Sequence, residues 1–288
     1  MKHFVAIFIC SLLFFVGCKE KETVVEKPFY PAVGAINARY SIADDVTVVF
    51  AQGNLQYQAS TGSWRFASNQ YDVIGMDNEL VDTLYDGWID LFGWGTSGNE
   101  GLMPYTVVDS NDKYGMPEMD ICGTEYDWGL HNVIGNGGVQ QRVWRIMSYE
   151  EWRYLFSYRE QAGVKRGLAT IEGVRADGGS MKGLVLLPDK WELPQGCQFR
   201  FGVADGYGTN KYSVEQWMAM EGAGAVFLPA GGYRDKKKVS LVGEYGCYWT
   251  GSYNDEATAY DIYMQDKDYA ISTAARSNGH SVRLVQER

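Results

Sequence analysis

The sequence predicts an α+β fold built from antiparallel strands, two main helices and long loops. Aromatic residues make up 14% of the chain, and short aromatic-rich runs bounded by Gly, Asn and Asp are typical of strands joined by turns. Two segments instead show helical spacing behind a capping sequence. Four further strand-like runs occupy the last third of the chain, and the sum is an antiparallel sheet with two helices.

Residues 1–17 are expected to be a lipoprotein signal peptide. Lys2 gives a positive start, and Phe4–Val16 is apolar except for one serine. As a helix this run would span about 20 Å against a hydrocarbon core of about 30 Å, so it fits a signal peptide and is too short for a stable span. Gly17 and Cys18 then resemble the lipobox of bacterial lipoproteins, although Phe stands where Leu is usual.

The lipobox resemblance implies cleavage before Cys18 and acylation of that cysteine, which would anchor the protein to a membrane through its lipid. Lys19–Glu22 resembles the charged signals that send some Gram-negative lipoproteins to the outer face, with a solvated linker as the alternative. The expected organisation is an acylated cysteine and flexible tether over 18–40 and a single domain over 41–288. The expected location is the outer membrane, facing the cell exterior.

Charge and cysteine usage exclude several classes of protein. The chain has 36 Asp and Glu against 26 Lys and Arg, and an acidic chain repels nucleic acid, so nucleic acid is not an expected partner. With Cys18 acylated, three cysteines follow, namely Cys122, Cys197 and Cys247. At most one disulfide can form among three thiols, so there is no disulfide framework. Whether any pair forms stays open.

The elements can be placed in chain order. Alternating residues predict strands within 46–58 and 63–75, paired across the turn between them. From about 76 to 142 the periodicity fades, which predicts a long loop region organised around tryptophans. Helices are predicted after Ser148 and after Ser213, because Glu151 and Gln216 follow at the spacing of a capping box.

The remaining strands follow from alternating apolar runs. A hairpin is predicted from 166–174 and 182–191, between the two helices. The tip at 234–238 is predicted to be an exposed hairpin turn. The predicted strands of the last third are 224–233, 246–253, 258–265 and 280–287.

Five motifs in this order and spacing resemble the bacterial major paralogous domain family named after Fibrobacter succinogenes. They are the segments 144–156, 183–191, 224–235, 248–253 and 276–285. The family shares a C-type-lectin-like fold with the sulfatase-modifying-factor group. The resemblance implies that the last strand returns to pair near the first, with Val282 and Leu284 in the core and Arg283 pointing the other way. It also places the segment between the last two motifs where related lectin-like proteins bind ligands.

Motifs for catalysis and cofactors are weak. Gly93–Gly98 matches G-x-G-x-x-G, but no helix is predicted after it, so turns are the simpler interpretation. His131 and His280 are the two histidines after the signal, and the cysteines lack C-x-x-C spacing, so no metal site is predicted. No G-x-S-x-G elbow supports a Ser–His–Asp hydrolase.

Calcium and copper sites have different sequence requirements. Asp266 and Asp268 could join a structural calcium site, since Ca²⁺ takes 6–8 oxygen ligands, and this option stays open beside a solvated acidic face. The triplets that calcium-dependent lectins use are absent. Formylglycine-generating enzymes share the fold, but their closing R-G-G-S-W is replaced here, and Cys197 and Cys247 form no recognisable copper pair. We therefore expect no enzyme activity and no cofactor, and such an oxidase is the least favoured alternative.

The expected function is non-catalytic recognition of a glycan or protein at the cell surface, with a structural or adhesin-associated subunit as the alternative. Tyrosine combines apolar area with a hydroxyl at low entropy cost, which is common in binding surfaces. Strand alternation lets Asp261 and Tyr263 share one face and puts Tyr260 on the other. The candidate ligand-binding residues are Tyr253, Asn254, Asp255, Tyr260, Asp261, Tyr263, Arg276, Asn278 and His280.

Overall fold

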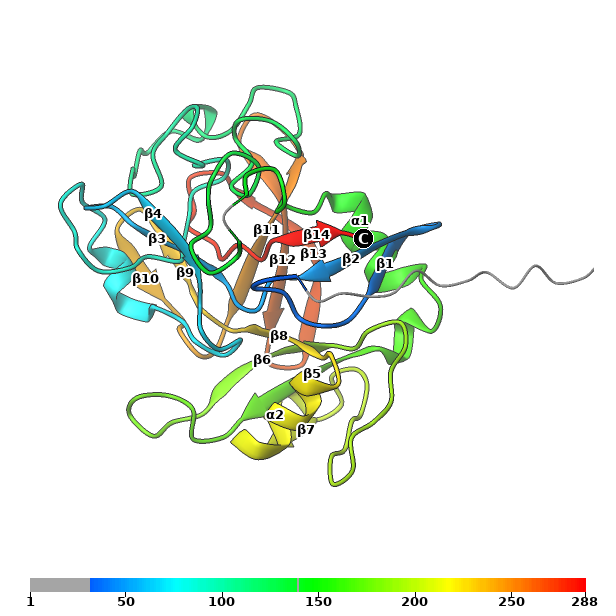
Figure 1. Cartoon of the computed structure of the whole chain (residues 1–288). Helices are drawn as coiled ribbons and strands as arrows, with labels where there is room; N and C mark the ends of the chain where they lie inside the picture. Colours follow the sequence, from blue (N-terminus) through cyan, green and yellow to red (C-terminus); the bar gives the residue numbers. More distant parts are fainter. Residues whose placement is uncertain (1–31, 139) are drawn as a thin grey trace, which may run out of the picture. The chain divides into compact units, whose positions relative to one another are not determined.

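The computed structural model describes residues 32–138 and 140–288 (Figure 1). The predicted signal peptide and Cys18 lie outside these residues. The last part of the predicted tether is structured, since Ile36 is buried and its amide donates to the Phe50 carbonyl at 2.8 Å. Ordered packing thus begins before residue 41, because the apolar side chains of this stretch cover the first strands.

A three-stranded antiparallel sheet joins the two ends of the described chain. Its strands, in spatial order, are β1 (Tyr40–Ala43), β2 (Val46–Phe50) and β14 (Val285–Glu287). Val285 lies opposite Phe50, and Figure 1 shows β14 beside β2. The prediction that the last strand pairs near the first is confirmed. Val282 and Leu284 are fully buried, as predicted, and Arg283 between them is also buried.

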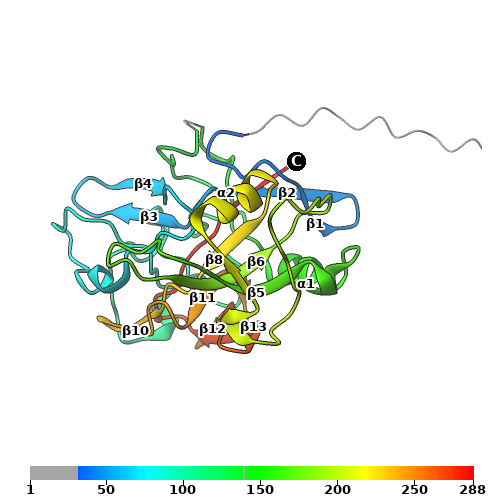
Figure 2. The ribbon, with the colours of Figure 1, turned by 90° about the horizontal axis from the view of Figure 1, so that it is seen from below.

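The β3–β4 hairpin and the region after it carry an aromatic core. The hairpin and the two short 3₁₀ helices that follow are β3 (Leu55–Gln58), β4 (Ser63–Phe66), η1 (Gly75–Glu79) and η2 (Asn111–Lys113). The predicted loop region is confirmed. Its Trp94 and Trp128 are buried in one cluster with Trp64 of the hairpin and Trp249 of the last third, so the loop is held by packing against its neighbours. The β3–β4 and β1–β2 hairpins lie on opposite sides of the molecule (Figure 1, Figure 2).

Both predicted helices are present with their capping boxes. They are α1 (Tyr149–Ser157) and α2 (Val214–Gly222). At α1 the Ser148 hydroxyl accepts from the Glu151 amide at 3.2 Å, and the Glu151 carboxylate accepts from the Ser148 amide at 2.8 Å. Ser213 and Gln216 repeat both bonds at α2. Each pair satisfies two helix N–H groups that would otherwise lack partners.

Three strands between the two helices and one strand after the second helix form a four-stranded sheet. Its spatial order is β7 (Asn210–Tyr212), β5 (Arg166–Ile171), β6 (Met181–Leu186) and β8 (Val226–Pro229). The predicted β5–β6 hairpin is confirmed, and β5–β7 is the one parallel pair in this sheet. Trp217 and Met220 of α2 pack with Phe227 on one face. Leu184 and Leu228 face the core cluster shared with α1.

The last third forms a three-stranded antiparallel sheet and a small hairpin. The sheet is β11 (Gly246–Tyr253), β12 (Thr258–Gln265) and β13 (Asp268–Ala275), and the hairpin is β9 (Tyr233–Asp235) and β10 (Lys238–Ser240). The predicted tip is exposed at 235–238, where Lys236 is left-handed at φ 52°, but Arg234 at the start of the predicted range is fully buried. Strand β13 was not predicted, because its small and polar residues show little apolar alternation.

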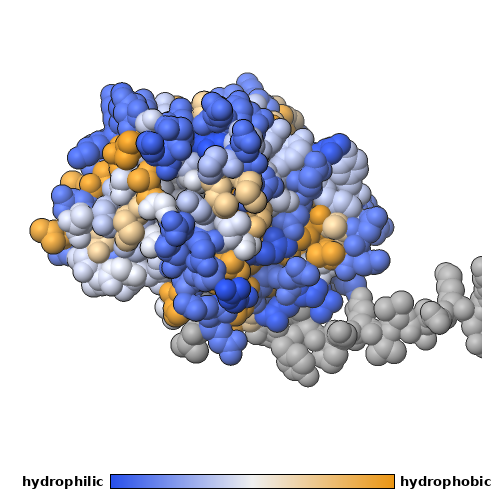
Figure 3. All heavy atoms as spheres, turned by 90° about the horizontal axis from the view of Figure 1, so that it is seen from above, coloured by the Kyte–Doolittle hydropathy of each residue, from blue (hydrophilic) through white to orange (hydrophobic). Residues whose placement is uncertain are grey.

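On the face shown in Figure 3, hydrophilic residues predominate and hydrophobic residues occur in separate patches. None of the helices in 32–138 and 140–288 is long and apolar enough to cross a bilayer. The three cysteines in the described part of the chain are free thiols.

Together the helices and strands described above confirm an α+β fold of mainly antiparallel strands with two main helices.

Candidate functional site

Three neighbouring chain segments bring Cys247, Asp261 and His280 together. In the β11–β12 pairing, Cys247 lies opposite Tyr263 and Trp249 lies opposite Asp261. Side chains at alternate positions share one face of a sheet, so Cys247 and Asp261 lie on the same face. The segment that contains His280 runs along the other edge of β11, because residue 281 pairs in parallel with residue 248.

The three side chains are close and buried. His280 Nδ1 lies 3.4 Å from Asp261 Oδ2. One sulfur, nitrogen or oxygen atom of each residue lies within 4.8 Å of the other two. The His280 ring stacks on Trp249, with 4.2 Å between centroids and 21° between planes. The exposed fractions are 2% for Cys247, 3% for Asp261 and 2% for His280, so bulk water barely reaches them.

Burial controls the charges of this cluster. Burial raises the pKa of Asp261 to about 7. Burial, followed by the positive charge of Arg234, lowers the pKa of His280 to about 3. Burial, followed by the Asp261 carboxylate, raises the pKa of the Cys247 thiol well above its ordinary value. A neutral thiol beside a neutral imidazole is not the thiolate–imidazolium pair of a nucleophilic cysteine.

Two polar atoms of the cluster have no hydrogen-bond partner. Within the described residues, neither His280 Nδ1 nor Asp261 Oδ1 has one. The 3.4 Å contact between the two side chains is too long or too poorly aligned to count as a hydrogen bond. Most buried polar groups in native proteins are paired. An unpaired carboxylate next to an unpaired ring nitrogen therefore indicates a missing partner at this position.

A cavity of about 340 Å³ opens above the cluster, and we call it the tyrosine pocket. Cys247, Asp261 and His280 line its buried part, and more exposed residues line its mouth, among them Tyr233, Tyr245, Gln265, Thr273 and Asn278. Tyr245 stacks on Tyr263 at 6.1 Å between centroids and meets Tyr233 edge-on at 6.0 Å. The mouth thus offers flat apolar area beside hydroxyl and amide groups.

The structure brings four of the nine sequence-predicted residues to this pocket. Asp261, Asn278 and His280 line it, and Tyr263 lies beside it through its stack on Tyr245. Tyr260 lies on the opposite face of β12, as its alternation indicated, and stacks on Tyr149 at 4.3 Å between centroids. The Tyr260 side chain therefore faces away from the tyrosine pocket.

The other four predicted residues gather around the β11–β12 turn. The Asp255 carboxylate accepts hydrogen bonds from backbone amides of that turn. The side-chain amide of Asn254 also donates to the Asp255 carboxylate, at 3.0 Å. The Arg276 guanidinium lies over the Trp94 ring at 5.0 Å and the Tyr253 ring at 4.6 Å. It also donates to backbone carbonyls of the long loop. Arg276 is thus buried and occupied in holding the turn against the loop.

Sequence reasoning missed Cys247, Tyr233 and Tyr245. Tyr233 falls within the 224–235 motif and Cys247 adjoins the 248–253 motif, but neither motif carries a ligand spacing, and nothing near Tyr245 in the sequence indicates a site. Alternation puts Cys247 on one face of its strand, but only the strand register places Asp261 beside it. The sequence did offer one signal for the site. It was the expected pairing of the strands at 246–253 and 258–265, taken together with the position of His280 shortly before β14.

The candidate calcium residues are engaged in local bonds. The Asp268 carboxylate accepts from the Tyr263 hydroxyl at 2.6 Å. The Asp266 carboxylate accepts from the Tyr207 amide at 3.2 Å. Neither aspartate belongs to the one three-residue grouping of potential metal ligands found within 32–138 and 140–288.

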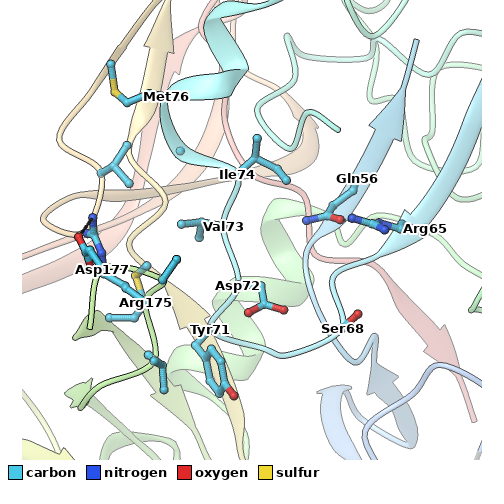
Figure 4. Close-up of a pocket in the computed structure, with 15 residues that line it drawn as sticks. Gln56, Arg65, Ser68, Tyr71, Asp72, Val73, Ile74, Met76, Arg175 and Asp177 are labelled. Atoms are coloured by element: carbon cyan, nitrogen blue, oxygen red, sulfur yellow. Dashed lines mark hydrogen bonds and ion pairs between the residues drawn. The ribbon is translucent and has the colours of Figure 1, made fainter. Parts of the chain in front are cut away.

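A larger cavity of about 700 Å³ lies between the β3–β4 hairpin and the β5–β6 turn (Figure 4). Gln56 and Arg65 project from the hairpin, and Arg175 and Asp177 stand on the opposite side. These polar groups already pair with one another. Arg65 donates to Gln56 at 2.8 Å and lies over Trp88 at 3.8 Å, and Arg175 pairs with Asp177 at 3.2 Å. The tyrosine pocket has more unpaired polar atoms and is the stronger candidate.

Comparison with known proteins identifies no relative of this chain. No family model, no curated protein and no solved structure matches the chain. A fold does not by itself imply a function. The chemistry of the tyrosine pocket is therefore the basis on which a function can be proposed.

Proposed function

We propose that this chain is an outer-membrane lipoprotein whose C-type-lectin-like domain recognises a glycan at the tyrosine pocket without catalysis. The observation that carries the proposal is the pocket itself. Its volume of about 340 Å³ is near the lower end of the usual range for small-ligand sites. Such a volume suits one or two sugar units better than the broad surface of a folded protein.

The lining of the pocket supports the same ligand class. Tyr233 and Tyr245 supply flat apolar surface of the kind that packs against a sugar ring. The side chain of Asn278 lines the cavity and makes no hydrogen bond in the described residues, and Thr273 is exposed at the mouth. Tyrosine and asparagine are common in binding surfaces because they combine adaptable polar groups with low entropy cost.

Two features favour the lectin-like interpretation of the fold. The first and last strands pair in one sheet, and a long loop region packs beside the strands of the last third. The first is what the family resemblance implies, and the second agrees with the long loops predicted from the sequence. The neutral state of Cys247 and His280 favours binding over nucleophilic catalysis, since it is the thiolate that reacts.

Replacing Tyr245 or Asn278 with alanine should weaken glycan binding by the full chain, purified in detergent, by about 10-fold or more. Truncating a central tyrosine commonly costs about 2 kcal/mol of binding free energy, or about 30-fold in Kd. The measurement is a glycan array followed by titration of the best ligand. The matched controls are Tyr158→Ala and Asn99→Ala, which change exposed residues outside the pocket.

Two results would contradict the glycan proposal. One is equal binding by the pocket variants and the controls. The other is no array signal together with co-purification of a fixed protein partner, which would favour the structural or adhesin-associated subunit instead.

Cys18→Ala should move the protein from the membrane fraction to the soluble fraction. The reason is that acyl chains on Cys18 are proposed as its membrane attachment, and two or more chains are needed for stable anchoring. Cell fractionation with metabolic fatty-acid labelling measures both attachment and acylation, and Cys122→Ala is the matched control. Unchanged membrane fractionation of Cys18→Ala would refute the lipid anchor without affecting the glycan proposal.

A further inference from the structure

We infer that Cys247, Asp261 and His280 form a three-ligand site for a divalent transition-metal ion of the Zn²⁺ class, with its open position facing the tyrosine pocket. The inference rests on the three side chains and does not require that the pocket bind a glycan.

The distances within the cluster suit such an ion. Zinc bonds of about 2.0 Å to nitrogen and oxygen at the tetrahedral angle place those two ligand atoms about 3.3 Å apart. His280 Nδ1 and Asp261 Oδ2 are 3.4 Å apart. The ligand atoms of all three residues lie within 4.8 Å of one another. Closing the cluster around zinc then needs inward shifts of about 1 Å, which side-chain rotation can supply.

The donor types select the class of ion. A thiolate, an imidazole nitrogen and a carboxylate are the three ligand types that zinc accepts, and three protein ligands with one free position are usual where zinc also meets a ligand or water. Sulfur and imidazole are poor ligands for Ca²⁺ or Mg²⁺, which prefer oxygen. The negative charges of Cys247 and Asp261 would balance the two positive charges of the ion.

The unpaired atoms provide an independent observation. Asp261 Oδ1 and His280 Nδ1 are buried without a hydrogen-bond partner in the described part of the chain. Burying a carboxylate without a partner is costly, and a cation bound by either oxygen of Asp261 would offset the cost of burying its charge. The competing arrangement is a proton on Asp261 shared with His280, which would need no metal. Metal titration separates the two arrangements.

The position of the cluster gives the ion a role in binding. All three residues line the buried part of the tyrosine pocket, so the coordination position not taken by the protein faces that cavity. An oxygen of a bound ligand, or a water molecule, would occupy it. Metal binding would therefore add one strong oxygen-directed contact to a pocket otherwise lined by tyrosine, amide and hydroxyl groups.

The test is titration of the chelator-stripped full chain with Co²⁺ and Zn²⁺. We expect one equivalent of Co²⁺ to give a thiolate-to-metal charge-transfer band that Zn²⁺ then displaces. Cys247→Ser, Asp261→Asn and His280→Gln should each weaken binding more than about 100-fold, since losing only an outer-shell partner already costs 10–100-fold. The matched controls Cys197→Ser and His131→Gln should bind as the wild type does.

Thermal unfolding gives a second readout. At a Zn²⁺ concentration about 100 times Kd, the wild-type unfolding temperature should rise by about 5–10 °C. Asp261→Asn removes a buried charge with little change of shape, so this variant should fold without metal and show no rise with Zn²⁺. If Zn²⁺ did not raise the unfolding temperature of the wild-type chain, that result alone would overturn the inference, and no variant would be needed. Cobalt bands of equal strength in wild type and Cys247→Ser would do the same, by showing an adventitious ion only.

Discussion

Deleting residues 280–288 should abolish cooperative unfolding of the whole domain. The deletion removes β14 from the edge of β2 and takes Val282, Leu284 and Val285 out of the core, where each is fully buried. Burying one such side chain contributes about 1.5–3 kcal/mol, so the three together account for about 5–9 kcal/mol. That amount is comparable with the whole stability of a typical domain, about 5–15 kcal/mol. Calorimetry and near-ultraviolet circular dichroism measure the loss.

The matched control is deletion of Glu287 and Arg288 alone. Both residues are exposed, and the main loss is the pair of bonds between Thr47 and Arg288 at the end of the sheet, each 2.8 Å long. The control should therefore unfold cooperatively at a slightly lower temperature. If the nine-residue deletion melted at the wild-type temperature with the same cooperativity, the proposed closure of the domain by its last strand would be wrong.

Local sequence signals predicted the elements whose causes are local. The capping serines and their partners three residues later fixed both helix starts, because those bonds form within one turn. Strand β12 followed from alternation, since one of its faces is the more buried, whereas β11 is buried on both faces and followed from its apolar, aromatic-rich run. Strand β13 has only half-buried and exposed residues, so its sequence carries no alternation to detect.

The candidate site was only partly predictable because it depends on register. His280 and Asp261 were chosen for their polar character, but Cys247 was not, although it lies against both. The three residues come from strands that are neighbours in space and distant in the chain, so no ligand spacing exists for a motif to describe. Arg276 shows the reverse error. Its charge indicated a binding role, while burial against Trp94 gives it a structural one.

Arg283→Met should lower the free energy of unfolding by about 3 kcal/mol or more. The buried guanidinium donates to the Asn54 side chain at 3.1 Å, to the Ala51 carbonyl at 3.0 Å and to the Phe227 carbonyl at 2.9 Å. Methionine fills similar space but donates nothing, and each buried acceptor left unpaired costs about 1–3 kcal/mol. Burial also lowers the pKa of Arg283 to about 10, so relief of this desolvation offsets part of the loss.

Chemical denaturation of three variants tests the role of Arg283. Arg283→Lys keeps the charge but loses the planar fork that reaches several acceptors at once, so it should fall between wild type and Arg283→Met. Arg288→Met is the matched control, because Arg288 is exposed at the chain end and should change stability by less than about 0.5 kcal/mol. An Arg283→Met variant within 1 kcal/mol of wild type would mean that the guanidinium does not hold the first sheet against β8. Since these bonds join segments more than 50 residues apart in the chain, their loss should also broaden the unfolding transition.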